Sequence, residues 1–104
     1  MNFAENLKQL PSVAHLAGLQ LNSPDGQVVA IIENKPGQAG SLAVYAAMAQ
    51  IHGGINRDAS LAALDIYAEH TEDARLHPGK HPNIDRLLAI AAGSAPLTVT
   101  LLPT

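Results

Sequence analysis

The chain has no cysteine and no tryptophan, and its 104 residues include only one phenylalanine and two tyrosines. Without cysteine it has no disulfide, no thiolate metal site and no cysteine nucleophile. Without many aromatic side chains the core must rest on leucine, isoleucine and valine, and much of the remaining apolar content is alanine, which buries little area. We therefore expect a domain of modest stability.

Clustered positive charge and long apolar runs are also missing. Six Lys and Arg residues stand against nine Asp and Glu, which gives a formal charge of −3. No group of basic residues could neutralise a run of phosphates, so we expect no nucleic-acid partner. No uninterrupted apolar stretch approaches membrane-spanning length, and residues 1–10 do not have the pattern of a signal peptide. We expect a cytoplasmic protein with no membrane partner.

What the sequence does contain is enough for one domain over residues 1–104. Residues 2–10 predict a short helix. The alternation at residues 19–21, the turn Ser23-Pro24-Asp25-Gly26 and the Val- and Ile-rich residues 27–33 predict a β-hairpin. Its second strand is apolar on both faces, which indicates cover on both sides or a central place in the sheet.

The rest of the chain predicts helices followed by one strand. Ser41 is the expected N-cap of a helix that ends near His52, and a long helix should then run from Asn56 or Asp58 to about His77. A further helix is marked by apolar residues from Ile84 to Ala91, and residues 97–101 alternate like a strand.

The fold class is therefore α+β, with a small three-stranded sheet formed by the N-terminal hairpin and the C-terminal strand and three to four helices packed on one face. Neither edge of such a sheet has a charge or proline in its interior to block pairing, so we expect a homodimer.

Residues 77–83, His77-Pro78-Gly79-Lys80-His81-Pro82-Asn83, form the densest group of residues that could do chemistry. We call this segment the 77–83 connection. Pro78 should end the preceding helix, and the next helix should begin with Asn83 as its N-cap or with Pro82 in its first turn. Backbone N–H groups near Gly79 and at the helix start, with charge from Lys80, His77 and His81, predict a site for a small anionic ligand that also includes Asn83. A purely structural turn would need the same proline and glycine residues.

Two other chemistries compete for the same histidines. A metal site would use His70, Asp73, His77 and His81, but Pro78 and Gly79 separate His77 from His81, so these side chains converge only if the chain folds back. Acid–base catalysis would pair the histidines with Asp73 or Glu69. Neither alternative comes with a complete signature, and no cofactor is predicted.

Gly37 and Gly40 before Ser41 resemble the layout of a phosphate-binding loop. Such loops place two glycines five apart and follow them with lysine, whereas these glycines are three apart and Lys35 precedes them. A capped loop with two permissive glycines is therefore the preferred interpretation.

Three segments together, residues 40–45, 67–71 and 77–88, resemble a small family of uncharacterised bacterial proteins of about this length, and the resemblance covers nearly the whole chain. It implies a bacterial cytoplasmic origin and transfers no activity, cofactor or site. The sequence thus favours a non-enzymatic binding or interaction module, with a small anionic ligand or a protein as its partner. The alternative is a small enzyme, with or without a metal, that uses the His, Asp and Glu cluster.

Overall fold

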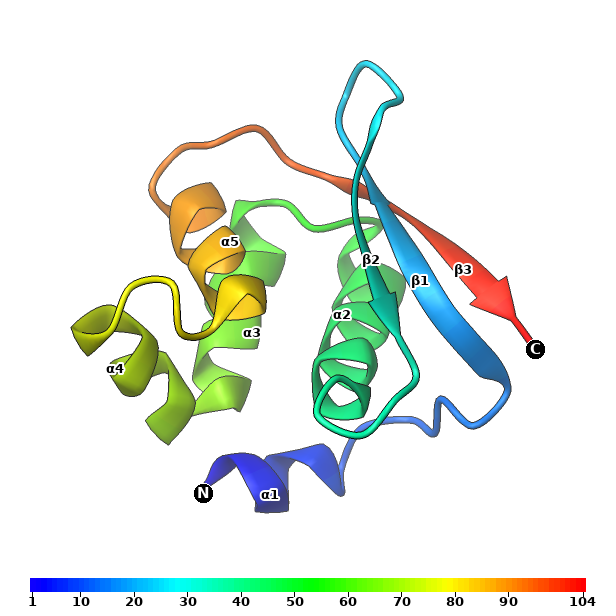
Figure 1. Ribbon diagram of the computed structural model, residues 1–104. Coiled ribbons are helices and arrows are strands. Elements are labelled where there is room, and N and C mark those ends of the chain that lie inside the picture. Colours follow the sequence, from blue (N-terminus) through cyan, green and yellow to red (C-terminus); the bar gives the residue numbers. More distant parts are fainter.

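The three-stranded sheet is the organising element of the fold. The computed structural model describes residues 1–104. Strands β1 (Leu16–Asn22), β2 (Val28–Glu33) and β3 (Thr98–Pro103) form an antiparallel sheet in the order β2-β1-β3. The C-terminal strand thus crosses back to pair with β1, as Figure 1 shows. The predicted hairpin, the third strand and the α+β class are all confirmed.

The central position in the sheet belongs to β1, so the prediction that the second strand is central or doubly covered is wrong. Strand β2 lies at an edge, and Val28, Val29 and Ile31 are each about half exposed. In contrast, Leu19 and Leu21 of β1 are fully buried. The composition of β2 could not reveal its position because the position depends on which hairpin strand β3 joins.

Close backbone packing fixes Gly18 in the middle of this sheet. Gly18 pairs with Glu33 on one side and Leu102 on the other. A Cβ atom at this position would lie 2.5 Å from the Ile32 carbonyl oxygen, which is closer than real Cβ atoms approach. Glycine is therefore required here by contact rather than by an unusual φ angle.

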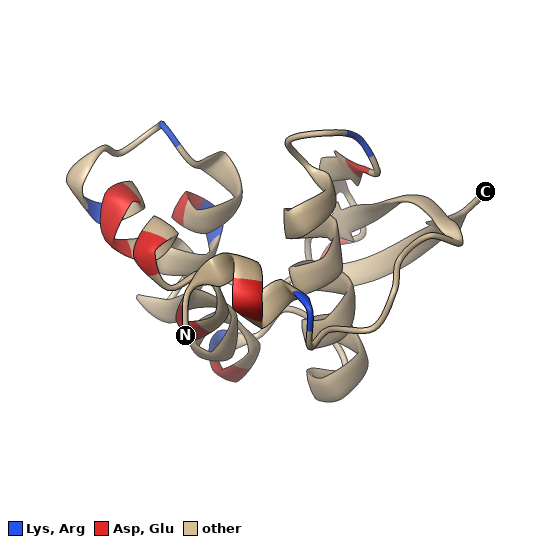
Figure 2. Ribbon diagram, turned by 90° about the horizontal axis from the view of Figure 1, so that it is seen from below, with Lys and Arg blue, Asp and Glu red and all other residues tan.

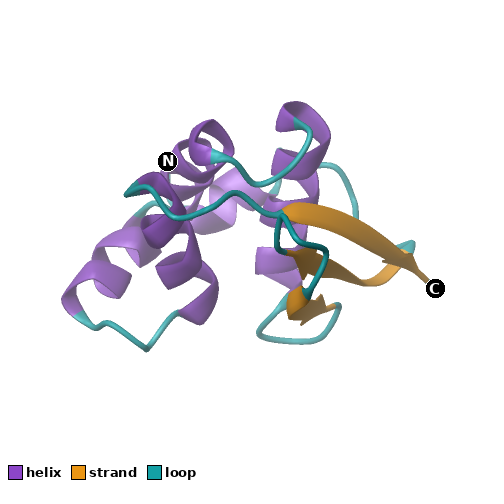
Figure 3. Ribbon diagram, turned by 90° about the horizontal axis from the view of Figure 1, so that it is seen from above, coloured by secondary structure: helices purple, strands orange, loops and turns teal.

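All five helices lie on one side of the sheet (Figure 3). They are α1 (Phe3–Leu7), α2 (Ala39–His52), α3 (Arg57–Tyr67), α4 (Glu69–Leu76) and α5 (Pro82–Ala91). Helix α2 packs against the strands, and α3 and α5 pack against each other beyond it. Gly53 ends α2 with φ 80°, in the left-handed conformation that glycine adopts most easily.

The helix count exceeds the prediction by one because the expected long helix breaks at Ala68. Ala68 has φ 52° and ψ −114°, which cannot continue an α-helix. The Thr71 hydroxyl donates to the Leu64 carbonyl at 2.6 Å and so satisfies a carbonyl that the break leaves free. The break also separates the acidic residues: Asp65 lies on α3, whereas Glu69, Glu72 and Asp73 lie on α4, the helix with red segments at the left of Figure 2.

A single cluster of 18 buried apolar residues joins the sheet to the helices. Its largest fully buried side chain is Tyr45, and Tyr67 is almost as well covered. Both hydroxyl groups have a partner: Tyr45 Oη donates to the Asn83 carbonyl at 2.5 Å, and Tyr67 Oη donates to Ser41 Oγ at 2.6 Å. None of the helices is long and apolar enough to cross a membrane.

Candidate functional site

Three side chains of the 77–83 connection converge on the carboxylate of Asp73. Its Oδ2 atom accepts from Lys80 Nζ at 2.8 Å and from His81 Nε2 at 2.6 Å. His77, four residues after Asp73, has its Nε2 atom 3.8 Å from Oδ1. Pro78 and Gly79, the latter with φ 92°, reverse the chain so that Lys80 and His81 return to the carboxylate of α4. The chain therefore does fold back, and it does so around an ion pair.

The two hydrogen bonds also set the charge of Asp73. The bond from the Lys80 ammonium, followed by the bond from the His81 ring, lowers the pKa of the Asp73 carboxyl from 3.8 to about 2. The carboxylate is therefore ionised at every pH near neutrality. Because the side chain is one-third exposed, solvent screens the pair, and its main effect is to fix the position of Lys80 and His81.

Backbone N–H groups of the connection also form hydrogen bonds that hold it in place. Lys80 N–H donates to the His77 carbonyl at 3.1 Å, and Gly79 N–H donates to Asp85 Oδ2 at 2.9 Å. Helix α5 begins at Pro82 with His81 as its N-cap, so the second of the two predicted helix starts is confirmed. Asn83 lies in the first turn, where its side-chain oxygen accepts from Arg86 at 2.9 Å.

A pocket of about 470 Å³ lies where the connection faces the start of α2. One wall comes from the loop before α2 and from its first turn, and the opposite wall comes from the connection and α5. Helix α1 and the junction of α3 with α4 complete the lining. The polar or charged side chains in this wall are those of Ser41, Tyr67, His70, Lys80, His81 and Asn83.

Two helix N-termini contribute backbone donors to this pocket. Neither α2 nor α5 has a side-chain hydrogen bond at its N-cap. The N–H groups of Gly40, Ser41 and Asn83 have no acceptor within the protein. All three residues line the pocket and are partly exposed. Unpaired N–H groups at a helix start carry the positive end of the helix dipole, so they favour an anionic group.

The remaining wall of the pocket is aromatic. Phe3 stacks on Tyr67 with ring centroids 5.0 Å apart and meets the edge of His70 at 5.1 Å. The rings of His70 and His81 lie 5.8 Å apart. Burial raises the pKa of Tyr67 well above 10, so its hydroxyl stays protonated and serves as a donor to Ser41. The pocket therefore combines hydrogen-bond donors with a flat apolar surface.

Comparison with known proteins gives the chain a family but no activity. The model of the family DUF2322, described as an uncharacterised protein conserved in bacteria, matches residues 3–101. The chain belongs to this family. The resemblance that the sequence suggested is thus confirmed. No curated protein and no solved structure matches the chain.

In this DUF2322 protein the sequence-predicted site residues divide into two groups. Lys80, His81 and Asn83 line the pocket together with His70. His77 and Gly79 lie outside its wall, and the His77 side chain is 61% exposed. Asp73 does not line the pocket but positions two residues that do.

The metal alternative finds no support in this arrangement. His70, Asp73, His77 and His81 were its proposed ligands, and no group of three or more His, Asp or Glu side chains lies close enough together to hold a metal ion. The His81 nitrogen nearest to Asp73 is already occupied by its hydrogen bond to that carboxylate, and Lys80 occupies the same oxygen.

The α2 half of the pocket was not predicted from the sequence, in which Gly37 and Gly40 were interpreted as part of a capped loop. Ser41 is not the N-cap: the helix starts at Ala39, and Gln38 takes the cap position without a capping side chain. Gly37, Gly40 and Ser41 instead line the pocket. Their position at a helix start is typical of an anion site. However, no residue near them in the sequence indicates that the 77–83 connection faces them.

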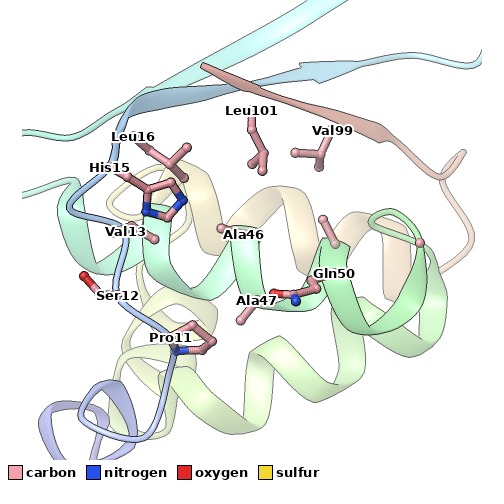
Figure 4. A pocket seen from close by; sticks show the side chains of 12 residues that line it. Pro11, Ser12, Val13, His15, Leu16, Ala46, Ala47, Gln50, Val99 and Leu101 are labelled. Carbon is pink, nitrogen blue, oxygen red and sulfur yellow. The ribbon is translucent and has the colours of Figure 1, made fainter. Parts of the chain in front are cut away.

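A second pocket in this family member is largely apolar (Figure 4). It has a volume of about 320 Å³ and lies between residues 11–16, one face of α2 and strand β3. Leu16, Ala46 and Leu101 contribute to its apolar wall, and its polar side chains are those of Ser12, His15 and Gln50. It contains no ion pair and no convergent donors, so it is the weaker candidate for a functional site.

Proposed function

We propose that this protein is a non-enzymatic binding module for a small anionic ligand, which it holds in the pocket between α2 and the 77–83 connection. The observation that supports this proposal most strongly is the convergence of two uncapped helix starts, with Lys80, His70 and His81, on one pocket. The ligand class is a small molecule with a carboxylate or phosphate group, and the Phe3 and Tyr67 side of the pocket suits a flat or apolar remainder.

Neutral donors, more than net charge, account for the attraction that we expect between this pocket and an anion. Asp73 offsets the charge of Lys80, so these two residues together add little net charge. The neutral donors are the N–H groups of Gly40, Ser41 and Asn83. Each lies at a helix start, where the positive end of the helix dipole favours an anionic group.

Thermal stability measured against inorganic phosphate and pyrophosphate tests the proposal. A ligand that binds only the native state stabilises it by about 1.4 kcal/mol at a concentration tenfold above Kd. The variants Lys80→Gln and His81→Gln should reduce the stabilisation, because both side chains line the pocket. Lys35→Gln is the matched control, because Lys35 is an exposed lysine that forms a comparable ion pair with Glu33 and does not line the pocket. If neither anion stabilises the wild type, or if Lys35→Gln alone abolishes the effect, the proposal is wrong.

A second candidate function is supported by the Asp73–His81 pair. A carboxylate held 2.6 Å from a histidine ring orients the ring for proton transfer. The Nδ1 atom of His81 makes no hydrogen bond in the structure, and His81 lines the pocket. An enzyme of this kind would lose turnover of its substrate in the variants Asp73→Asn and His81→Gln. The variant His77→Gln would retain turnover, because the His77 side chain is exposed and lies 3.8 Å from the same carboxylate, which is too far for a hydrogen bond.

Association into a homodimer and a cytoplasmic location remain proposals that rest on the sequence. For the dimer the structure offers two free sheet edges, at β2 and at β3. A homodimer formed through one of them would leave the pocket open, because the pocket contains no residue of the sheet.

A further inference from the structure

Strand β2 forms a free edge with an unusually apolar surface. Its first five residues, Val28-Val29-Ala30-Ile31-Ile32, carry no charge and no proline. Val28, Val29 and Ile31 are exposed by 52%, 51% and 53%. Edge strands in monomeric proteins usually carry a charge, a proline or a covering segment that prevents pairing with another strand. No helix covers the outer face of this sheet (Figure 3).

The hydrogen-bond pattern shows which backbone groups face outward. Asn34 N–H, just after the end of β2, donates to the Ala17 carbonyl of β1 at 2.8 Å. Antiparallel pairing alternates between residues that bond to the neighbour and residues that face away. Ile32 therefore bonds toward β1, and Ile31 directs its N–H and carbonyl groups to the free edge. The Glu33 N–H, in contrast, is covered by the Gln38 side chain at 3.2 Å.

The one charged residue of β2, Glu33, does not prevent the strand from pairing with an identical strand. The Glu33 carboxylate lies 2.8 Å from Lys35 Nζ, so its charge is already compensated. In an antiparallel pair centred near Ala30, the two Glu33 residues lie at opposite ends, roughly 20 Å apart at about 3.4 Å per residue. The apolar side chains of Val29 and Ile31 then face each other across the twofold axis. Such a strand is complementary to itself.

The other free edge is less suited to this role. On the outer face of β3 the exposed side chains are those of Thr98 and Thr100, and the strand ends at Pro103, which has no N–H group. Ile31, Gln20 and Thr100 lie in one row across the outer face, because Gln20 pairs with both of the others. The apolar end of this row is therefore at β2.

We propose that a second copy of this chain pairs antiparallel with β2 and extends the sheet from three strands to six. A typical stable interface buries about 800 Å² on each partner, which is about one-seventh of the 5713 Å² surface of this chain. A six-residue strand and its neighbours provide less than that. The dimer is therefore weak, with a Kd on the order of micromolar. It is independent of the proposed anion site.

Sedimentation equilibrium from about 0.1 μM to about 100 μM tests the proposal, because this range brackets a micromolar Kd. The wild type should shift from monomer to dimer. Ile31→Lys should raise the dimer Kd at least tenfold, since it places two like charges at the axis. Thr100→Lys is the matched control in the same row at the opposite edge, and it should leave the Kd within about twofold.

Hydrogen exchange of the wild-type amides provides a test that does not depend on a variant's folding. The Ile31 amide should exchange more slowly at high protein concentration, and the Glu33 amide, already bonded to Gln38, should change much less. A monomer throughout the concentration range overturns the proposal. So does a dimer that Thr100→Lys disrupts and Ile31→Lys does not.

Discussion

The substitution Tyr45→Phe should destabilise the protein by about 2 kcal/mol. The Tyr45 ring is fully buried in the core, and its hydroxyl joins α2 to the start of α5. It donates to the Asn83 carbonyl at 2.5 Å and accepts from Arg86 Nη1 at 3.2 Å. Removal of one partner of a buried hydrogen bond costs about 1–3 kcal/mol, with the larger values for bonds to charged groups. The phenyl ring itself still fills the same space, so no cavity adds to this loss.

Urea unfolding followed by circular dichroism measures the effect as a lower midpoint at an unchanged slope. The same loss corresponds to a fall in Tm of about 8–15 °C for a domain of this size. Tyr67→Phe is the matched control. Its hydroxyl donates to Ser41 Oγ, which is partly exposed and can bond to water instead, so we expect a loss below about 1 kcal/mol.

The order of the two losses decides whether the reasoning holds. If Tyr67→Phe proved as damaging as Tyr45→Phe, the bond from Tyr45 to the start of α5 would not hold the two helices together as argued. A changed slope in the Tyr45→Phe variant would also contradict the account, because it would indicate a change in compactness rather than one lost contact.

Three further predictions concern the sheet, the helix break and the Asp73 cluster. Gly18→Ala should destabilise the protein by about 1–3 kcal/mol, because the new Cβ would meet the Ile32 carbonyl at 2.5 Å; an unchanged urea midpoint would contradict this. Ala68→Gly should stabilise it by up to about 1 kcal/mol, since φ 52° strains alanine but not glycine, and a lower midpoint would refute the strain. The hydrogen bond from Lys80 lowers the pKa of Asp73 from 3.8 to about 2, so its stabilising contribution is complete above about pH 5 and disappears as the pH falls through 2. The difference in urea midpoint between the wild type and Asp73→Asn should follow the same course, and a difference as large at pH 2 as at pH 7 would be inconsistent with the ion pair.

Much of the fold could be predicted because its signals are local. The turn at residues 23–26, the glycine after His52 and the Pro82 helix start each depend on the conformation of a few neighbouring residues, and each appears in the structure. The two main errors concern longer-range effects. Nothing near Ala68 in the sequence indicates a helix break, and the edge position of β2 depends on a strand more than sixty residues away.

Only one half of the candidate site could be predicted from the sequence. The 77–83 connection was identified from its own prolines, histidines and lysine, and Lys80, His81 and Asn83 do line a pocket. The other half, around Gly40 and Ser41, belongs to a different helix. No periodicity or spacing in one sequence shows that two helix starts face each other, because that relation arises from packing in the core.

The most direct test of the anion site is a nitrogen-15 NMR titration of the wild-type protein with pyrophosphate. The account predicts that the largest amide shifts occur at Gly40, Ser41 and Asn83, whose N–H groups have no acceptor in the protein. It also predicts that the amides of β2, none of which belongs to a residue that lines the pocket, change much less. Shifts confined to other exposed residues, or no shifts at all at millimolar pyrophosphate, would contradict it.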